Sequence, residues 1–99
     1  MDKLKELISR CECGVYVQVN AHRDVYQTVA QWFEDQASCG FPLGNIPPEV
    51  CAEMVRLDTM VEVQFYPDTP VGFYNVVHFD LDAALDAALA LLGGKKGGT

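Results

Sequence analysis

The sequence predicts an α+β fold, a two-layer sandwich in which helices pack on one face of a three-stranded, mainly antiparallel sheet. Two patterns support this fold class. Three segments alternate apolar and polar residues with the period of a strand, and four segments repeat apolar residues with the period of a helix, in the order α-β-α-α-β-β-α. Because 99 residues suffice for one domain, we expect a single α+β domain over residues 1–94 and a flexible tail over residues 95–99.

The chain starts with a short helix and the clearest strand of the sequence. Leu4, Leu7 and Ile8 recur at helical spacing and predict a helix over residues 2–9. Residues 12–20 alternate in character, which predicts a half-buried strand. The residues of this strand expected to face the core are Cys13, Val15, Val17 and Val19.

Two helices and a loop separate this strand from the next one. Asp24 and Gln27 resemble a capping box and predict a helix over residues 25–38. The loop of residues 39–48 combines two glycines and three prolines with apolar side chains that we expect it to shelter: Phe41, Leu43 and Ile46. Pro48, the last residue of the loop, suits the first turn of a helix over residues 48–57.

A β-hairpin and a last helix complete the predicted fold. Residues 61–66 and 71–79 both alternate in character, and residues 67–70, which include two prolines, form the turn between them. Asp80 is a suitable N-cap for a helix that ends at residues 93–94, both glycine. Spacing does not determine the order of the strands, and we place the first strand beside the third.

In this layering one face of the sheet lacks helical cover and is rich in tyrosine. The side chains expected on it are Tyr16, Gln18, Glu62, Gln64, Tyr66, Tyr74, Val76 and His78. Tyrosine joins a large apolar ring to a hydrogen-bonding tip and is enriched in protein interfaces, so this face suits recognition of a second copy or of another protein. Two alternatives remain open: a solvated face without a partner, and a platform for a planar small molecule.

The charge of the chain narrows the class of partner. The chain holds 14 acidic and 7 basic residues, and twelve of the acids but only Arg23 and Arg56 lie between residues 11 and 92. A negative field repels nucleic-acid phosphates and anionic lipid head groups, so we expect neither nucleic acid nor membrane as a partner. A basic protein remains a possible class of partner, because its charge is opposite to that of this chain. Because the chain contains no long apolar segment and no secretory signal, we expect a cytoplasmic location.

Four cysteines and two histidines are candidate metal ligands: Cys11, Cys13, Cys39, Cys51, His22 and His78. Their spacing contains no CxxC pair and no HxxxH, the patterns typical of zinc sites. Cys13 and Cys51 fall at positions expected to face the core, where a free thiol packs like a small apolar side chain. We therefore predict buried thiols without metal or cofactor, with a zinc site and disulfides as the alternatives.

Few residues suggest catalysis. His78 precedes Asp80 by two residues, and the two form the one acid–base pair that the sequence offers. The segment that begins at Asp80 contains several acids but lacks the central glycine and the closing glutamate of a calcium loop. Because acids are favoured at a helix N-terminus, we expect these acids to stabilise the start of the helix. The chain has no glycine-rich phosphate loop and no nucleophile elbow. The sequence therefore favours a non-enzymatic protein.

The hypothesis that follows is a small acidic interaction module, a homodimer or a binder of a basic protein, that uses the open face of the sheet. Its predicted binding residues are Tyr16, Gln18, Gln64, Tyr66, Tyr74, Val76 and His78. The alternative is a small enzyme or ligand-binding protein whose pocket is bordered by His78, Tyr74, Tyr16 and the loop of residues 39–48.

Overall fold

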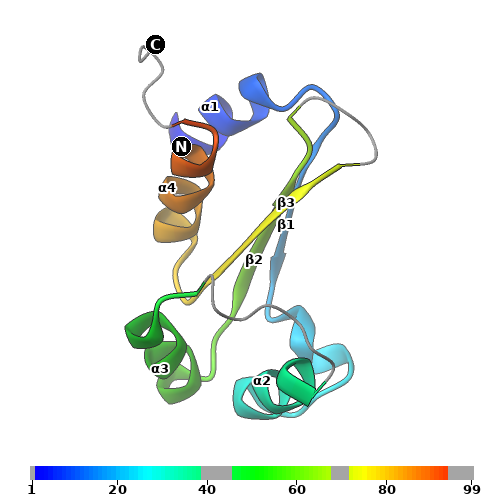
Figure 1. The fold of residues 1–99 in the computed structure, drawn as a ribbon, viewed down its shortest axis with the longest axis vertical. Coiled ribbons are helices and arrows are strands. Elements are labelled where there is room, and N and C mark those ends of the chain that lie inside the picture. Colours follow the sequence, from blue (N-terminus) through cyan, green and yellow to red (C-terminus); the bar gives the residue numbers. More distant parts are fainter. Residues whose placement is uncertain (1, 39–45, 68–71, 94–99) are drawn as a thin grey trace.

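The computed structural model describes residues 2–38, 46–67 and 72–93. Within these residues, four α-helices, one 3-10 helix and a three-stranded antiparallel sheet follow the predicted order α-β-α-α-β-β-α, which confirms the α+β fold class (Figure 1). The elements are α1 (Asp2–Arg10), β1 (Val15–Val19), η1 (Ala21–Asp24), α2 (Val29–Ser38), α3 (Pro48–Leu57), β2 (Val61–Phe65), β3 (Tyr74–His78) and α4 (Leu81–Leu91). The predicted tail and the loop residues Phe41 and Leu43 lie outside the described residues.

The strands lie in the sheet in the order β1-β2-β3, with both pairs antiparallel. Our placement of the first strand beside the third is therefore wrong. The main-chain N–H of Asn20 donates to the carbonyl of Met60 at 2.6 Å, and the Asn20 side-chain oxygen accepts from the N–H of Met60 at 2.8 Å. These bonds hold the end of β1 against the start of β2, so α2 and α3 extend beyond the sheet instead of carrying the chain across it.

One face of the sheet is covered by α1 and α4. The buried side chains of this core are Leu7, Cys11, Val61, Val63, Phe65, Val76, Ala84, Leu85 and Ala88. Lys3 also links the two helices, because its Nζ lies 2.8 Å from a carboxylate oxygen of Asp82 and 2.9 Å from one of Asp86. The short helix α1 is thus held by burial of Leu7, which is fully inaccessible to solvent, more than by its own length.

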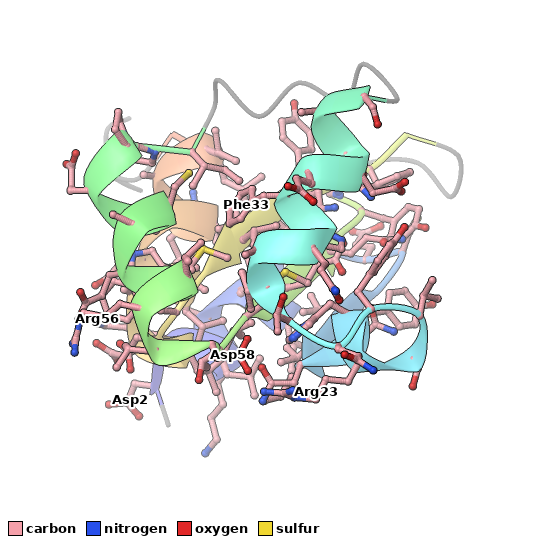
Figure 2. The ribbon with its side chains drawn as sticks, turned by 90° about the horizontal axis from the view of Figure 1, so that it is seen from below. Asp2, Arg23, Phe33, Arg56 and Asp58 are labelled. Atoms are coloured by element: carbon pink, nitrogen blue, oxygen red, sulfur yellow. The ribbon has the colours of Figure 1, made fainter. Side chains whose placement is uncertain are left out.

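A second apolar cluster lies where α2 and α3 pack at the far end of the sheet (Figure 1). Its buried members are Val29, Ile46, Met54, Met60 and Val77, and Phe33 lies against it between the two helices (Figure 2). Val77 follows Val76 in β3, so its side chain points to the opposite face of the sheet. The α2–α3 pair therefore covers part of the face that α1 and α4 leave open.

The start of α2 differs from the prediction. Residues 21–24 form a 3-10 turn, and the helix begins at Val29. Its capping box consists of Thr28 and Gln31: Thr28 Oγ1 accepts from the Gln31 N–H at 3.1 Å, and Gln31 Oε1 accepts from the Thr28 N–H at 3.3 Å. The predicted cap at Asp24 is therefore wrong, because a second candidate cap follows it four residues later.

Asp58 explains why the later cap is the one used. This residue ends α3 in the left-handed conformation, with φ 54°. Its carboxylate accepts from the Val29 N–H at 2.9 Å and pairs with Arg23 of η1 at 2.8 Å (Figure 2). The bond from Val29, and then the charge and hydrogen bond of Arg23, lower the pKa of Asp58. A single side chain thus fixes η1 and the first turn of α2 against the end of α3.

Removing the Thr28 cap tests this assignment. We expect Thr28→Ala to lower the free energy of unfolding by about 1 kcal/mol, because the amide of Gln31 loses its acceptor. The matched change Asp24→Ala should have little effect, since Asp24 is exposed and does not cap α2. Urea unfolding followed by the fluorescence of Trp32 measures both. Equal losses in the two variants would contradict the cap at Thr28.

Candidate functional site

The pairing register divides the predicted binding residues between the two faces of the sheet. Val76 lies opposite Val63 and His78 opposite Val61, so Tyr74, Val76 and His78 share the face that α1 and α4 cover. Tyr16 lies opposite Gln64, on the other face, which carries Gln18 and Tyr66 as well. The prediction that all seven residues share one face is therefore wrong.

The prediction failed at β3, because the two central residues of this strand are apolar and point to opposite faces of the sheet. Its central residues Val76 and Val77 are only 9% and 8% exposed. Val76 packs in the cluster under α1 and α4, and Val77 packs in the cluster of α2 and α3. Alternation alone cannot fix the phase of such a strand, because either set of side chains is suited to burial.

Three aromatic rings form a row on the open face of the sheet, at the end away from α2 and α3. The ring centroids of Tyr16 and Tyr66 lie 5.9 Å apart with planes at 86°, and those of Tyr66 and Phe73 lie 5.5 Å apart with planes at 44°. Tyr16 is 56% exposed and Phe73 is 51% exposed. We call Tyr16, Tyr66 and Phe73 the aromatic row. Phe73 is absent from the predicted binding residues, because the predicted phase of β3 directs its side chain to the other face.

A β-bulge beside β1 positions the first ring of the row. The N–H of Cys13 donates to the carbonyl of Tyr66 at 3.3 Å, and the N–H of Tyr66 donates to the carbonyl of Gly14 at 3.0 Å. Two residues therefore oppose one, as in a bulge. Gly14 has a φ of 126°, and a Cβ atom there would lie 3.2 Å from the ring of Tyr16. Glycine thus permits both the turn of the backbone and the close approach of the ring.

Polar and acidic groups continue the open face beside the row. Gln64 Nε2 donates to the hydroxyl of Tyr66 at 2.8 Å and holds that ring in place. Asn75 Nδ2 donates to Glu62 Oε2 at 2.6 Å across the β2–β3 pair, and Gln18 lies opposite Glu62 on β1. Exposed aromatic faces beside a carboxylate are the elements that bind a cationic side chain, through cation–π contact and a charge-assisted hydrogen bond.

His22 is a buried and unpaired histidine in η1. Its side chain is 3% exposed, and neither ring nitrogen has a hydrogen-bond partner among the described residues. Burial, and then the charge of Arg23, lower its pKa from the usual 6.5, against a smaller opposing effect of Asp58. The ring therefore packs in its neutral form.

His78 and Asp80 use their polar groups separately. The Nδ1 of His78 accepts from the N–H of Phe79 at 2.9 Å and from that of Asp80 at 3.3 Å. The carboxylate of Asp80 accepts instead from the N–H of Ala83 at 3.0 Å and caps α4 as predicted. Burial lowers the pKa of His78, with an opposing effect from the charge of Asp80. The acid–base pair suggested by spacing is therefore engaged in local structure.

Among the described residues, no disulfide joins the cysteines Cys11, Cys13 and Cys51. Cys11 is buried in the core under α1 and α4. Burial raises the pKa of the Cys51 thiol, whose Sγ lies 3.8 Å from the carbonyl oxygen of Ile46, and this disfavours the nucleophilic thiolate. Within residues 2–38, 46–67 and 72–93, no group of three or more metal-ligating side chains occurs. Cys39 lies outside these ranges.

The pocket predicted for a ligand or substrate is not assembled from the residues proposed to border it. Tyr16 lies on the opposite face of the sheet from Tyr74 and His78. Ile46 is 9% exposed and is part of the α2–α3 cluster. A shallow depression does occur in the described part of the chain, but it is lined by residues 23–27, away from the predicted site.

No protein-family model, curated protein or solved structure matches this chain. In the part of the chain that the structure describes, no helix has the length and apolar character needed to cross a bilayer. On the described surface, the aromatic row combines two exposed aromatic side chains with the ring of Tyr66 that both of them contact.

The two histidines predict a loss of stability in mild acid. Both have a pKa below 6.5 in the folded chain, so the unfolded chain binds protons first as the pH falls. The free energy of unfolding should therefore keep its full value above about pH 6.5 and decrease as the pH falls below it. His22→Leu should reduce this decrease, because leucine binds no proton in either the folded or the unfolded chain.

Urea unfolding of the wild type and of His22→Leu at pH 7.5 and 5.5 measures this effect, and His78→Gln separates the contribution of the second histidine. A wild type of equal stability at the two pH values would show that burial does not hold these rings neutral.

Proposed function

We propose that this chain is a small acidic interaction module that binds a basic segment of a partner protein on the open face of its sheet, with the aromatic row as the anchor. The observation that carries this proposal is the exposure of two aromatic side chains, Tyr16 and Phe73, each of which contacts the ring of Tyr66 between them. Clustered exposed aromatic groups are typical of interaction sites, and aromatic residues dominate binding energy in interfaces.

The row is ordered before any partner binds. Tyr66 contacts both neighbouring rings and accepts a hydrogen bond from Gln64. Gly14 brings the backbone of the bulge close under the ring of Tyr16. Because these contacts limit the rotamers open to the side chains, we expect binding to cost less conformational entropy than it would for side chains without such contacts.

The charge of the body favours a basic partner. The two basic residues between residues 11 and 92 are both paired within the chain, Arg23 with Asp58 and Arg56 with Glu53. The remaining acids of this region outnumber them, and Glu62 lies on the open face itself. A field of this sign accelerates encounter with cationic segments and disfavours acidic ones.

A titration with short peptides tests the proposal. A peptide of alternating arginine and glycine should bind and shift the NMR amide signals of residues 13–18, whereas a matched peptide with glutamate in place of arginine should not. Raising the salt concentration should weaken binding, since exposed charges are screened. Equal binding of the two peptides would overturn the proposal.

Substitutions locate the site. We expect the double change Tyr16→Ser and Phe73→Ser to weaken binding of the basic peptide by about tenfold or more, as loss of a central aromatic anchor does. The matched control is Tyr74→Ser, because Tyr74 is also a half-exposed aromatic side chain, at 47%, but lies on the other face. An affinity unchanged in the double variant would exclude the aromatic row as the anchor.

A further inference from the structure

The strand β1 is an edge of the sheet with an unused row of main-chain groups. Among the described residues it pairs with β2 on one side, and no strand lies on its other side. The hydrogen bonds of Gly14 with Tyr66 and of Asn20 with Met60 fix the phase of the ladder. Hydrogen-bonded pairs recur at every second residue, so Tyr16 and Gln18 direct their main-chain groups to β2. Those of Val15, Val17 and Val19 point outward.

The strand β1 lacks three of the usual protections of an edge strand. Natural edges are blocked by charged side chains, proline or helical cover. The sequence VYVQV contains none of these residues, and four of its five side chains are exposed. Val17 is 37% and Val19 is 61% exposed although both lie on the face that α1 and α4 cover. The other edge strand, β3, has two buried central valines.

From this geometry we propose that β1 pairs with β1 of a second copy of the chain, antiparallel and centred on Val17, so that the two sheets become one. In this register Val17 lies opposite Val17 of the second copy, and Val15 lies opposite Val19. In this register each residue with outward main-chain groups, Val15, Val17 or Val19, lies opposite another such residue of the second copy. The N–H and C=O groups of the two strands can therefore hydrogen-bond to each other. This inference goes beyond the proposed function and uses the edge of the sheet, not its open face.

The side chains on both faces suit this pairing. On the helix-covered face the pairing sets valine against valine and removes Val17 and Val19 from solvent, which is a favourable cross-strand combination. On the open face Tyr16 comes beside Gln18 of the second copy. The strand therefore complements itself at every position, as an interface on a two-fold axis requires.

The charge pattern permits a second copy to pair at this edge. The chain has a net charge of −7, so most of its surface repels another copy. Residues 13–21 carry no charged side chain, and this stretch is flanked by Glu12 on one side and Arg23 on the other. Antiparallel pairing of β1 with β1 on a two-fold axis joins this uncharged stretch to itself, so it sets no like charges opposite each other.

Oligomeric state measured over a dilution series by light scattering and sedimentation tests the pairing. The wild type should form a dimer that dissociates on dilution. Val17→Lys and Val17→Glu should each raise the dissociation constant of the dimer at least about tenfold, because the two-fold axis sets like charges opposite each other. The matched control Val25→Lys changes a valine that is 76% exposed outside the sheet and should leave the dimer intact. Circular dichroism confirms that each variant is folded.

Mixing the two variants tests the register. Because residue 17 lies opposite itself, an equimolar mixture of Val17→Lys and Val17→Glu should restore a dimer through a lysine–glutamate pair. A wild type that stays monomeric at every concentration, or a dimer that neither variant weakens, would overturn the proposal. Failure of the mixture to associate would overturn the register centred on Val17. Val17→Glu should still bind the basic peptide, so failure of the pairing and failure of the proposed function are distinguishable.

Discussion

Helices cover two of the three strands of the sheet and leave most of β1 exposed. The open face and the free edge of the sheet both follow from this incomplete cover. On the covered face, α4 packs mainly on β2 and β3, and α1 packs against α4. The fully buried sheet residues there, Val63 and Phe65, belong to the central strand. β1 is held by its hydrogen bonds to β2 but keeps Val17 and Val19 in solvent. A strand fixed in place without cover offers both a face and an edge for binding.

The chain between β1 and β2 limits the open face to one end of the sheet. It returns to the start of β2 through the Asn20–Met60 bonds and adds the α2–α3 pair beyond the strands. Asp58 joins the start of α2 to the end of α3, and the two helices share the apolar cluster that contains Val77. The aromatic row occupies the other end, where the bulge precedes β1, and this end remains open.

Local features of the fold could be predicted from the sequence, and features that depend on a distant partner could not. Pro48 at the start of α3 and Asp80 at the start of α4 act within one turn of their own helix, and both predictions are confirmed. The start of α2 depends on Asp58, which lies 29 residues beyond Val29. The phase of β3 depends on two clusters that bury both of its sides. For this reason Tyr16 and Tyr66 could be placed together, whereas Tyr74 was placed on the wrong face.

An uncovered edge strand normally invites unlimited association, yet the structure restricts what β1 can do. Gly14, with φ 126°, interrupts regular pairing before the strand, and Asn20, in the left-handed conformation with φ 54°, ends it. Only the five residues between them can extend a sheet. Pairing of β1 with its own copy uses the same edge on both chains, so it closes after two copies, whereas pairing with a different edge would continue as a filament. The short uncharged strand, bounded by turns on both sides, is thus suited to a closed pair.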